Sequence, residues 1–151
     1  MRVAQDAFDP QAETAAFVSG RNEAGALASF VGYCRAATDG AAVSELRIDH
    51  YPGFTEREIA RLANDIHLRF GCLDLLVIHR VGKIAPGEAI VLVAALATHR
   101  GEAFDAVRTL MDYLKTDAPL WKKETGPAGA RWIEPRPEDH MRRKIAGKEV
   151  A

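Results

Sequence analysis

Apolar residues recur at helical spacing in the segment before Gly71, and this segment is the clearest helix that the sequence predicts. Thr55 and Glu58 have the spacing of a capping box at its start, and Gly71 is placed to end it. One face of this helix is therefore expected to be buried. The apolar positions on that face lie three or four residues apart, at Ile59, Leu62, Ala63 and Ile66.

Two further helices are predicted on either side of it. Asp9 and Pro10 are typical of the N-cap and the first residue of a helix, which is expected to run to about Val18. A third helix is predicted over about residues 101–116, because its apolar residues again follow the three and four spacing of one buried face. That face consists of Phe104, Val107, Leu110, Met111 and Leu114.

Strand-like runs separate the helices. Two of them, "LDLLVIHRV" and "EAIVLVAALAT", are divided by Pro86-Gly87, and the second is apolar enough to lie at the centre of a sheet. Asp39-Gly40 predicts a turn between two other runs, either in a hairpin or in a longer loop. The remaining predicted strands are residues 2–8, 26–34 and 42–51 and a short strand around Trp132.

Helices that alternate with pairs of strands indicate an α+β fold with a mixed or antiparallel sheet, rather than a doubly wound parallel one. The chain has 151 residues, of which 48% are hydrophobic, and this is enough for a core. We expect residues 1–151 to form a single domain. Its end is predicted to contain a helix from Pro137 and a polar tail, about residues 141–151, that frays.

The charge of the chain argues against several classes of partner. The formal net charge is −1, from 20 Lys and Arg against 21 Asp and Glu, so no global field draws the protein to nucleic acid or to an acidic membrane. An RNA-binding α+β domain is disfavoured by this balance and by the lack of an aromatic-rich strand motif. Any anion-binding site must be local.

Cysteine content and hydropathy indicate a protein of the reducing cytoplasm. Cys34 and Cys72 have neither a CxxC nor another metal-ligand spacing, so a disulfide framework and a zinc site are both poorly supported. His50, His67 and His79 lie on separate predicted elements, and no metal is assigned to them. The longest apolar run, residues 89–97, is too short to cross a bilayer.

His99 and Arg100 stand at or just before the first turn of the third predicted helix. Cations there oppose the helix dipole, which favours negative charge at an N-terminus. A site for a phosphate or carboxylate would combine the free N–H groups with an added Arg and His. The ordinary alternative is a solvated Arg100 and a His99 that caps a carbonyl.

Lysines gather around the break at Pro119. Lys115 lies near the end of the third predicted helix, and Lys122 and Lys123 follow beside Trp121. A helix C-terminus stabilises an ammonium group, so reactivity at Lys115 would require burial or neighbouring cations. Each lysine alone is more commonly a solvated surface residue, and only their convergence would make a site.

The two Trp residues and Cys34 could serve a site, but a structural role is the commoner one for each. Trp121 and Trp132 could stack on a flat heterocycle, but core packing is the commoner use of Trp and is the expectation for both. Cys34 beside Arg35 could be an activated thiol, although a buried small apolar side chain is the commoner role in an apolar strand.

Taken together, several stretches resemble the molybdopterin synthase large (catalytic) subunit family, in the order and at the approximate spacing of that family. The K-T-x-A-P-x-W-K-[KR]-E segment is the most specific of them. The matching stretches are "SFVGYCR", "HYPGFTEREIA", "VIHRVGKIAPGE", "THRGEAFDAVRTLMDYLKTDAPLWKKE" and "ARWIE".

The resemblance implies an α/β hammerhead fold with an additional antiparallel β subdomain. It also implies a homodimer at the centre of a heterotetramer, with a small ubiquitin-like sulfur-carrier subunit at each end. The implied reaction converts cyclic pyranopterin monophosphate (precursor Z) to molybdopterin. Two sulfurs would come from the thiocarboxylate on the C-terminal Gly of the small subunit, and no cofactor is implied.

The same resemblance implies roles for particular residues. Lys115 would be the catalytic lysine and Lys122 its partner in the pocket, while the segment after Arg35, "AATDG", departs from the pattern of the family. The alternative is a non-catalytic pterin- or partner-binding module of the same fold, for which Lys115 would not be essential. The implied substrate-binding residues are Tyr33, Cys34, Arg35, His99, Arg100, Lys123, Glu124 and, on weaker grounds, Arg136.

Overall fold

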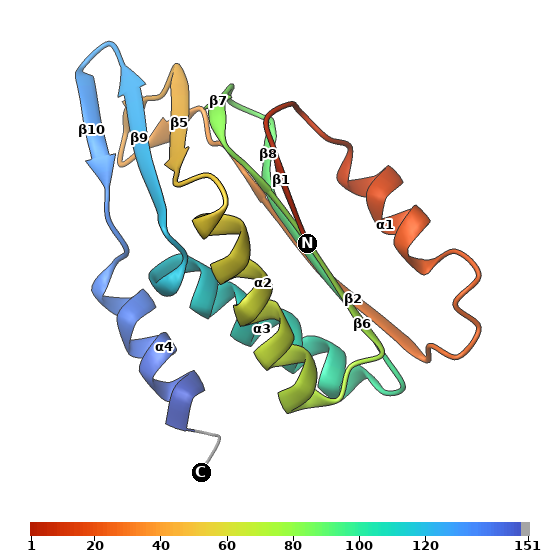
Figure 1. Cartoon of the computed structure of the whole chain (residues 1–151). Coiled ribbons are helices and arrows are strands. Elements are labelled where there is room, and N and C mark those ends of the chain that lie inside the picture. Colours follow the sequence, from red (N-terminus) through yellow and green to blue (C-terminus); the bar gives the residue numbers. More distant parts are fainter. Residues whose placement is uncertain (149–151) are drawn as a thin grey trace.

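A four-stranded sheet forms the centre of the protein (Figure 1). The structure, a computed structural model, describes residues 1–148. In this main sheet β1 runs parallel to β6, whereas β6 and β2 both pair antiparallel with β8. The mixed sheet and the central place of the apolar strand are both as predicted. The strand order is β1 (Arg2–Ala4), β6 (Asp74–Arg80), β8 (Ala89–Ala97) and β2 (Ala26–Tyr33).

Helices cover both faces of the main sheet (Figure 1). On one face α2 (Phe54–Phe70) and α3 (Arg100–Asp117) enclose the largest group of buried apolar side chains. On the other face Phe17 of α1 (Pro10–Val18) packs against a smaller apolar cluster. Because β8 is covered on both sides, it has no polar face, which explains its continuous apolar run.

A second, antiparallel sheet stands beside the first and has its own core. This small sheet has the order β10 (Gly129–Ile133), β9 (Leu120–Gly126), β5 (Glu45–His50) and β7 (Gly82–Ile84). The antiparallel subdomain of the predicted α+β fold is therefore present. Leu120 packs against the cores of both sheets and joins the two layers.

The predicted turn lies in the segment that connects β2 of the main sheet to β5 of the small sheet. Asp39 and Gly40 have φ angles of 50° and 81°, the left-handed conformation that a tight hairpin turn requires. They join β3 (Ala37–Thr38) to β4 (Ala41–Ala42), a hairpin of two very short strands. The flanking strands β2 and β5 do not pair with each other, since each belongs to a different sheet.

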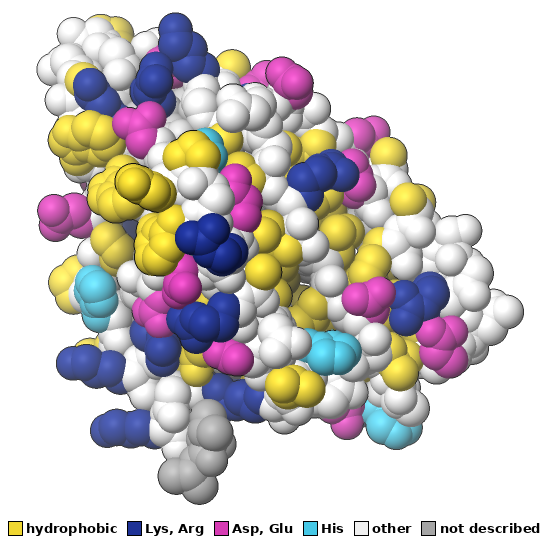
Figure 2. Space-filling view, in the orientation of Figure 1, with side chains coloured by type: hydrophobic (Ala, Val, Ile, Leu, Met, Phe, Trp, Pro, Cys, Tyr) yellow, Lys and Arg dark blue, Asp and Glu magenta, His cyan; other side chains and the backbone are white. Residues whose placement is uncertain are grey.

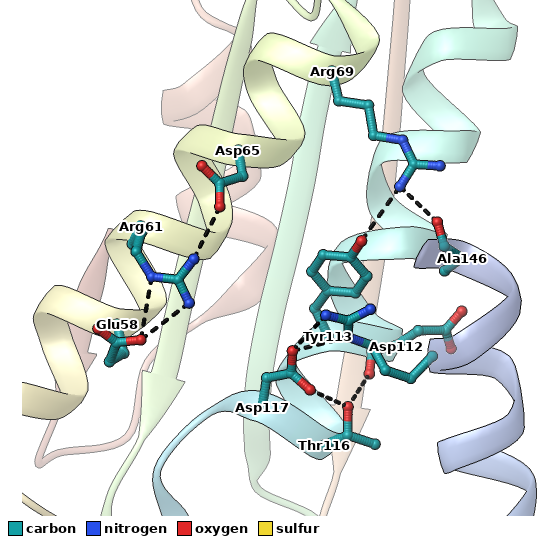
Figure 3. Close-up of polar contacts among 10 residues, drawn as sticks. Glu58, Arg61, Asp65, Arg69, Asp112, Tyr113, Thr116, Asp117 and Ala146 are labelled. Carbon is teal, nitrogen blue, oxygen red and sulfur yellow. Dashed lines mark hydrogen bonds and ion pairs between the residues drawn. The ribbon is translucent and has the colours of Figure 1, made fainter. Parts of the chain in front are cut away.

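The last helix, α4 (Pro137–Lys148), packs against α3. Residues 141–148 are helical where the sequence predicted a frayed tail, and residues 149–151 lie outside the described part of the chain. Side chains of α2 and α3 hold α4 in place. Arg69 of α2 donates a hydrogen bond of 2.7 Å to the Ala146 carbonyl (Figure 3). Arg143 of α4 pairs with Asp117 and lies 3.7 Å from the centre of the Tyr113 ring.

The start of α2 differs from the prediction. Its N-cap is Gly53, whose N–H donates a hydrogen bond of 2.6 Å to Glu56, so Thr55 and Glu58 do not form the capping box. Thr55 is instead fully buried and bonded elsewhere. The predicted end is confirmed, since Gly71 adopts the left-handed conformation and its N–H donates to the His67 carbonyl.

Three aromatic side chains are exposed where burial was expected. Phe104 lies outside the buried face of α3, which uses Ala103 and Ala106 in its place. Trp121 and Trp132 are 51% and 57% exposed. Figure 2 shows a group of exposed hydrophobic side chains on the side of the molecule where β9 and β10 lie. Core packing was therefore the wrong prediction for both Trp residues.

No helix within residues 1–148 is long and apolar enough to cross a membrane.

A matched pair of substitutions on α2 tests this packing. Leu62 is 2% exposed and Leu68 is 71% exposed. We expect Leu62→Ala to lower the free energy of unfolding by about 2–5 kcal/mol, because it leaves a cavity beneath the helix. Leu68→Ala should change it by less than about 0.5 kcal/mol. Urea unfolding followed by circular dichroism measures both, and equal losses would contradict the packing described.

Candidate active site

Charged side chains of α3, α4 and β9 interact near one end of α3. The Lys115 ammonium, near the end of α3, lies 3.6 Å from Oδ1 of Asp139 in the first turn of α4. Lys122 of β9 lies close enough for both of these charges to act on its pKa. The Asp139 side chain is only 10% exposed, whereas the Lys115 side chain is 50% exposed. A buried carboxylate therefore faces a lysine that remains open to solvent.

A short, hydrogen-bonded connection sets the two lysines relative to each other. Pro119, which lacks an N–H, follows the end of α3, and the chain turns there into β9. The buried hydroxyl of Thr55 donates a hydrogen bond of 3.0 Å to the Pro119 carbonyl and accepts one of 2.9 Å from the Tyr51 N–H. The start of α2 is thus bonded directly to the turn that separates Lys115 from Lys122.

Strand alternation directs Lys122 inward. Successive side chains of a strand point to opposite faces, so Lys122 shares a face with Leu120, which packs into both cores. Burial lowers the pKa of Lys122, the charge of Lys115 lowers it further, and Asp139 opposes the shift. Of the two lysines that the resemblance implies as catalytic, Lys122 is thus the desolvated one, and Lys115 is half exposed.

The same alternation separates Lys122 from Lys123. Lys123 points to the outer face of the small sheet, where it lies directly opposite Trp132 of β10. Its ammonium is 5.6 Å from the centre of the Trp132 ring, a cation–π distance. Lys123 therefore does not join Lys115 and Lys122.

Glu124 connects the small sheet to the β3–β4 hairpin. One carboxylate oxygen accepts a hydrogen bond of 2.9 Å from the hydroxyl of the buried Thr38, and the other pairs with Arg131 at 3.3 Å. Glu124 lies on the same face of β9 as Lys122. Its observed contacts are structural ones, to the hairpin and to the neighbouring strand.

The segment at the end of β2 alternates between buried and exposed residues. Cys34 lies in the core of the small sheet, and burial raises the pKa of its thiol, with a further contribution from the charges of Glu124 and Glu88. This supports the structural role for Cys34 over the activated thiol. Tyr33 and Arg35 are exposed on either side of it.

His99 and Arg100 lie at the other end of α3. Both are exposed, and the His99 side chain makes no capping hydrogen bond to the helix. A helix rises 1.5 Å per residue, so the backbone of Arg100 lies about 22 Å along α3 from that of Lys115. One chain therefore cannot bring the predicted anion-binding pair and the lysine pair into a single pocket.

Arg136 precedes α4 and lies beside Asp139. Its backbone N–H donates a hydrogen bond of 3.0 Å to Oδ2 of Asp139, and this bond caps the start of α4. Asp139 itself was missed by the sequence analysis, although an acidic residue shortly after Pro137 is a helix-start signal that could have found it.

His79 was also missed as a neighbour of the site. It is buried in β6, and burial, followed by the charge of Lys122, lowers its pKa to about 4. Its Nδ1 lies 2.8 Å from the Arg80 carbonyl. No sequence signal indicated this contact, because it depends on how the two sheets pack. Within residues 1–148 no group of His, Cys, Asp and Glu side chains is arranged to hold a metal ion.

The fold and the site define a class of protein: an α+β protein in which two lysines and a buried carboxylate meet where a helix-covered sheet joins a small antiparallel one. Comparison with known proteins identifies the family. The model of the MoaE protein family matches residues 3–117. The chain belongs to the MoaE family.

Individual relatives agree with this assignment. The chain is 50% identical over 139 residues to the molybdopterin synthase catalytic subunit of Ralstonia nicotianae, a match that covers 92% of this chain and 79% of the relative. It is 52% identical over 132 residues to the subunit of the same name from Caulobacter vibrioides, with 87% of each chain covered.

Solved structures show the same fold. The molybdopterin biosynthesis MoaE protein from Burkholderia ambifaria has a TM-score of 0.80 and 41% identity, over 99% of this chain and 97% of that chain. A protein-protein complex of subunits 1 and 2 of molybdopterin-converting factor from Helicobacter pylori contains a chain with a TM-score of 0.74. It is 20% identical, over 89% of this chain and 90% of that chain, and so shares the fold.

The buried His79 predicts a pH dependence of stability. Its pKa is about 4 in the folded protein, against about 6.5 in an unfolded chain. As pH falls, the unfolded state takes up this proton first, so stability is lost between pH 6.5 and pH 4. The loss from pH 7 to pH 5 should be about 2 kcal/mol.

Urea unfolding at pH 7 and pH 5 measures this loss, and the variant His79→Gln should show less of it, whatever its stability at pH 7. His67→Gln on α2 is the control and should keep the pH dependence, because His79 remains in place. An undiminished loss in His79→Gln would show that another group is responsible.

Proposed function

We propose that this protein is the catalytic subunit of a molybdopterin synthase, a sulfurtransferase of molybdenum cofactor biosynthesis. It would convert cyclic pyranopterin monophosphate to molybdopterin with two sulfurs from the C-terminal thiocarboxylate of a small sulfur-carrier subunit. The observation that carries this proposal is the pairing of Lys115 and Lys122. They belong to the most specific family segment and meet at one half-open site beside a buried carboxylate.

The proposed chemistry divides the work between the two lysines. A general base or a transient nucleophile must be a neutral amine, and Lys122, whose pKa is lowered by burial, supplies this form more readily than an ordinary lysine. Lys115, half exposed, is placed to meet the thiocarboxylate end of the partner. Arg136, beside the site, and Arg35 would neutralise the phosphate of the substrate.

The proposed assembly is a homodimer that binds a small ubiquitin-like subunit at each end. We place it in the cytoplasm, a location supported by the two free thiols, Cys34 and Cys72. No cofactor is needed for the proposed reaction, since both sulfurs arrive on the partner.

The homodimer would also give His99 and Arg100 a role. They lie about 22 Å along α3 from Lys115 in the same chain, so they can serve the lysine site only if a second copy supplies them. The exposed cations at the start of α3 would then hold the anionic substrate for the lysines of the neighbouring chain. Tyr33, Lys123 and Glu124 are proposed as further contacts or supports of the pocket.

Removing the Lys115 amine tests the function. With a thiocarboxylated small subunit and cyclic pyranopterin monophosphate, the unmodified protein should form molybdopterin. Lys115→Ala should be slower by about 100-fold or more, because the group that positions the thiocarboxylate of the partner is lost. Lys144→Ala on α4 is the matched control and should keep the full rate.

Product can be quantified by oxidation to its fluorescent derivative, and partner binding by calorimetry. If the partner binds normally but the unmodified protein forms no product, the protein is the alternative, a non-catalytic pterin- or partner-binding module. Equal rates for the unmodified protein and Lys115→Ala would show that Lys115 has no role in the mechanism.

A mixture of two inactive variants tests the shared pocket. Lys115→Ala and Arg100→Ala each damage a different end of α3, and each homodimer should be nearly inactive. After unfolding and refolding together, mixed dimers contain one pocket with both residues intact. We expect about one quarter of the unmodified activity in an equal mixture, since half of the dimers are mixed and each has one intact pocket of two. No recovery in dimers shown to be mixed would contradict sharing.

A further inference from the structure

Asp139 uses its two carboxylate oxygens for different purposes. Oδ2 accepts the Arg136 N–H at 3.0 Å and thereby caps α4, while Oδ1 faces the Lys115 ammonium at 3.6 Å. A helix cap requires only the first of these contacts. The second contact joins the last helix of the chain to the lysine site.

The Asp139 carboxylate is buried and lies near other charged side chains. Asp139 is 7% exposed, and an ionised carboxylate at such a position requires compensating partners. The charged groups that interact with it come from two elements: Lys115 and Asp112 on α3 and Lys122 on β9. Burial raises the pKa of Asp112, and the charge of Asp139 raises it further, whereas Arg142, Arg108 and Lys115 oppose this. Asp139 therefore pairs with Lys115, and its charge also raises the pKa of Lys122.

We propose that Asp139 is a positioning residue of the lysine site: its carboxylate holds the Lys115 side chain at the open side of the site and balances the positive charge between Lys115 and Lys122. This inference rests on the proposed function. It gives α4 a part in the reaction, because Asp139, the counter-ion of the two lysines, lies in the first turn of this helix.

The other contacts of α4 allow this role to be separated from simple support. Arg143 pairs with Asp117 and stacks on Tyr113, and the Ala146 carbonyl accepts from Arg69. These contacts hold α4 to α2 and α3, and none of them is made by Lys115 or Lys122. In Asp139→Asn the amide oxygen can still cap α4, so the substitution removes the charge and keeps the cap.

The first test is kinetic and uses the full chain with its thiocarboxylated partner. Asp139→Asn should lower kcat by about ten-fold or more with KM changed less than about two-fold, because a displaced catalytic group costs rate without weakening substrate binding. Asp139→Glu should recover part of the rate. Arg143→Ala, which loosens α4 at its other contact, should keep kcat within about two-fold. An equal loss in Arg143→Ala would overturn the proposal in favour of general support by α4.

The second test needs no turnover. Competitive acetylation with isotopically labelled acetic anhydride, read by mass spectrometry, gives the pH midpoint at which the Lys122 amine becomes reactive. Asp139 raises the pKa of Lys122, so Asp139→Asn should move this midpoint to lower pH, while Arg143→Ala should leave it in place.

The outcomes of the two tests separate the inference from the function on which it rests. An unchanged Lys122 midpoint in Asp139→Asn overturns the electrostatic contact, whatever the activity. A shifted midpoint with unchanged kcat overturns the positioning role. A lack of product from the unmodified protein with bound partner counts against the proposed function, and the labelling result then decides the contact between Asp139 and the lysines by itself.

Discussion

The geometry of the lysine site depends on one buried hydroxyl. Thr55, in the first turn of α2, binds the Tyr51 N–H and the Pro119 carbonyl and so connects the start of one helix to the end of another. Pro119 cannot continue α3, and its carbonyl, in this half-buried turn, accepts the hydrogen bond of the Thr55 hydroxyl. Since Lys115 precedes the turn and Lys122 follows it, the hydroxyl helps to set the separation of the two amines.

Two layers of the fold then give these amines different environments. β9 pairs with β5 on one side and β10 on the other, and this pairing turns Lys122 toward the interior while Lys123 faces outward. Lys115 projects from a helix end and keeps half of its side chain in solvent. α4 completes the arrangement, because its first turn brings Asp139 to the junction. The two amines of the site therefore differ in solvation, since Lys122 is desolvated and Lys115 is half exposed.

Much of the fold could be predicted from the sequence, and the predictions that were wrong follow a pattern. The ends of α1 and α2 at Asp9 and Gly71 are local signals, since each involves backbone groups within a few residues. β9 was missed because three charged residues follow one another in it, and a strand of this composition is stable only between two partners. Trp121 and Trp132 were expected in the core because their size suggests burial, yet they lie on the outer face of the small sheet.

The sequence by itself determined the elements whose signals are local: the helix ends, the apolar centre of the main sheet, and the presence of lysines on both sides of Pro119. Only the tertiary structure decided which lysines meet. It placed Asp139 beside Lys115, turned Lys123 away, and put Arg100 at the far end of α3. The physical reason is that the direction and the desolvation of a side chain depend on strand pairing and packing between segments far apart in the chain, which spacing along the sequence does not encode.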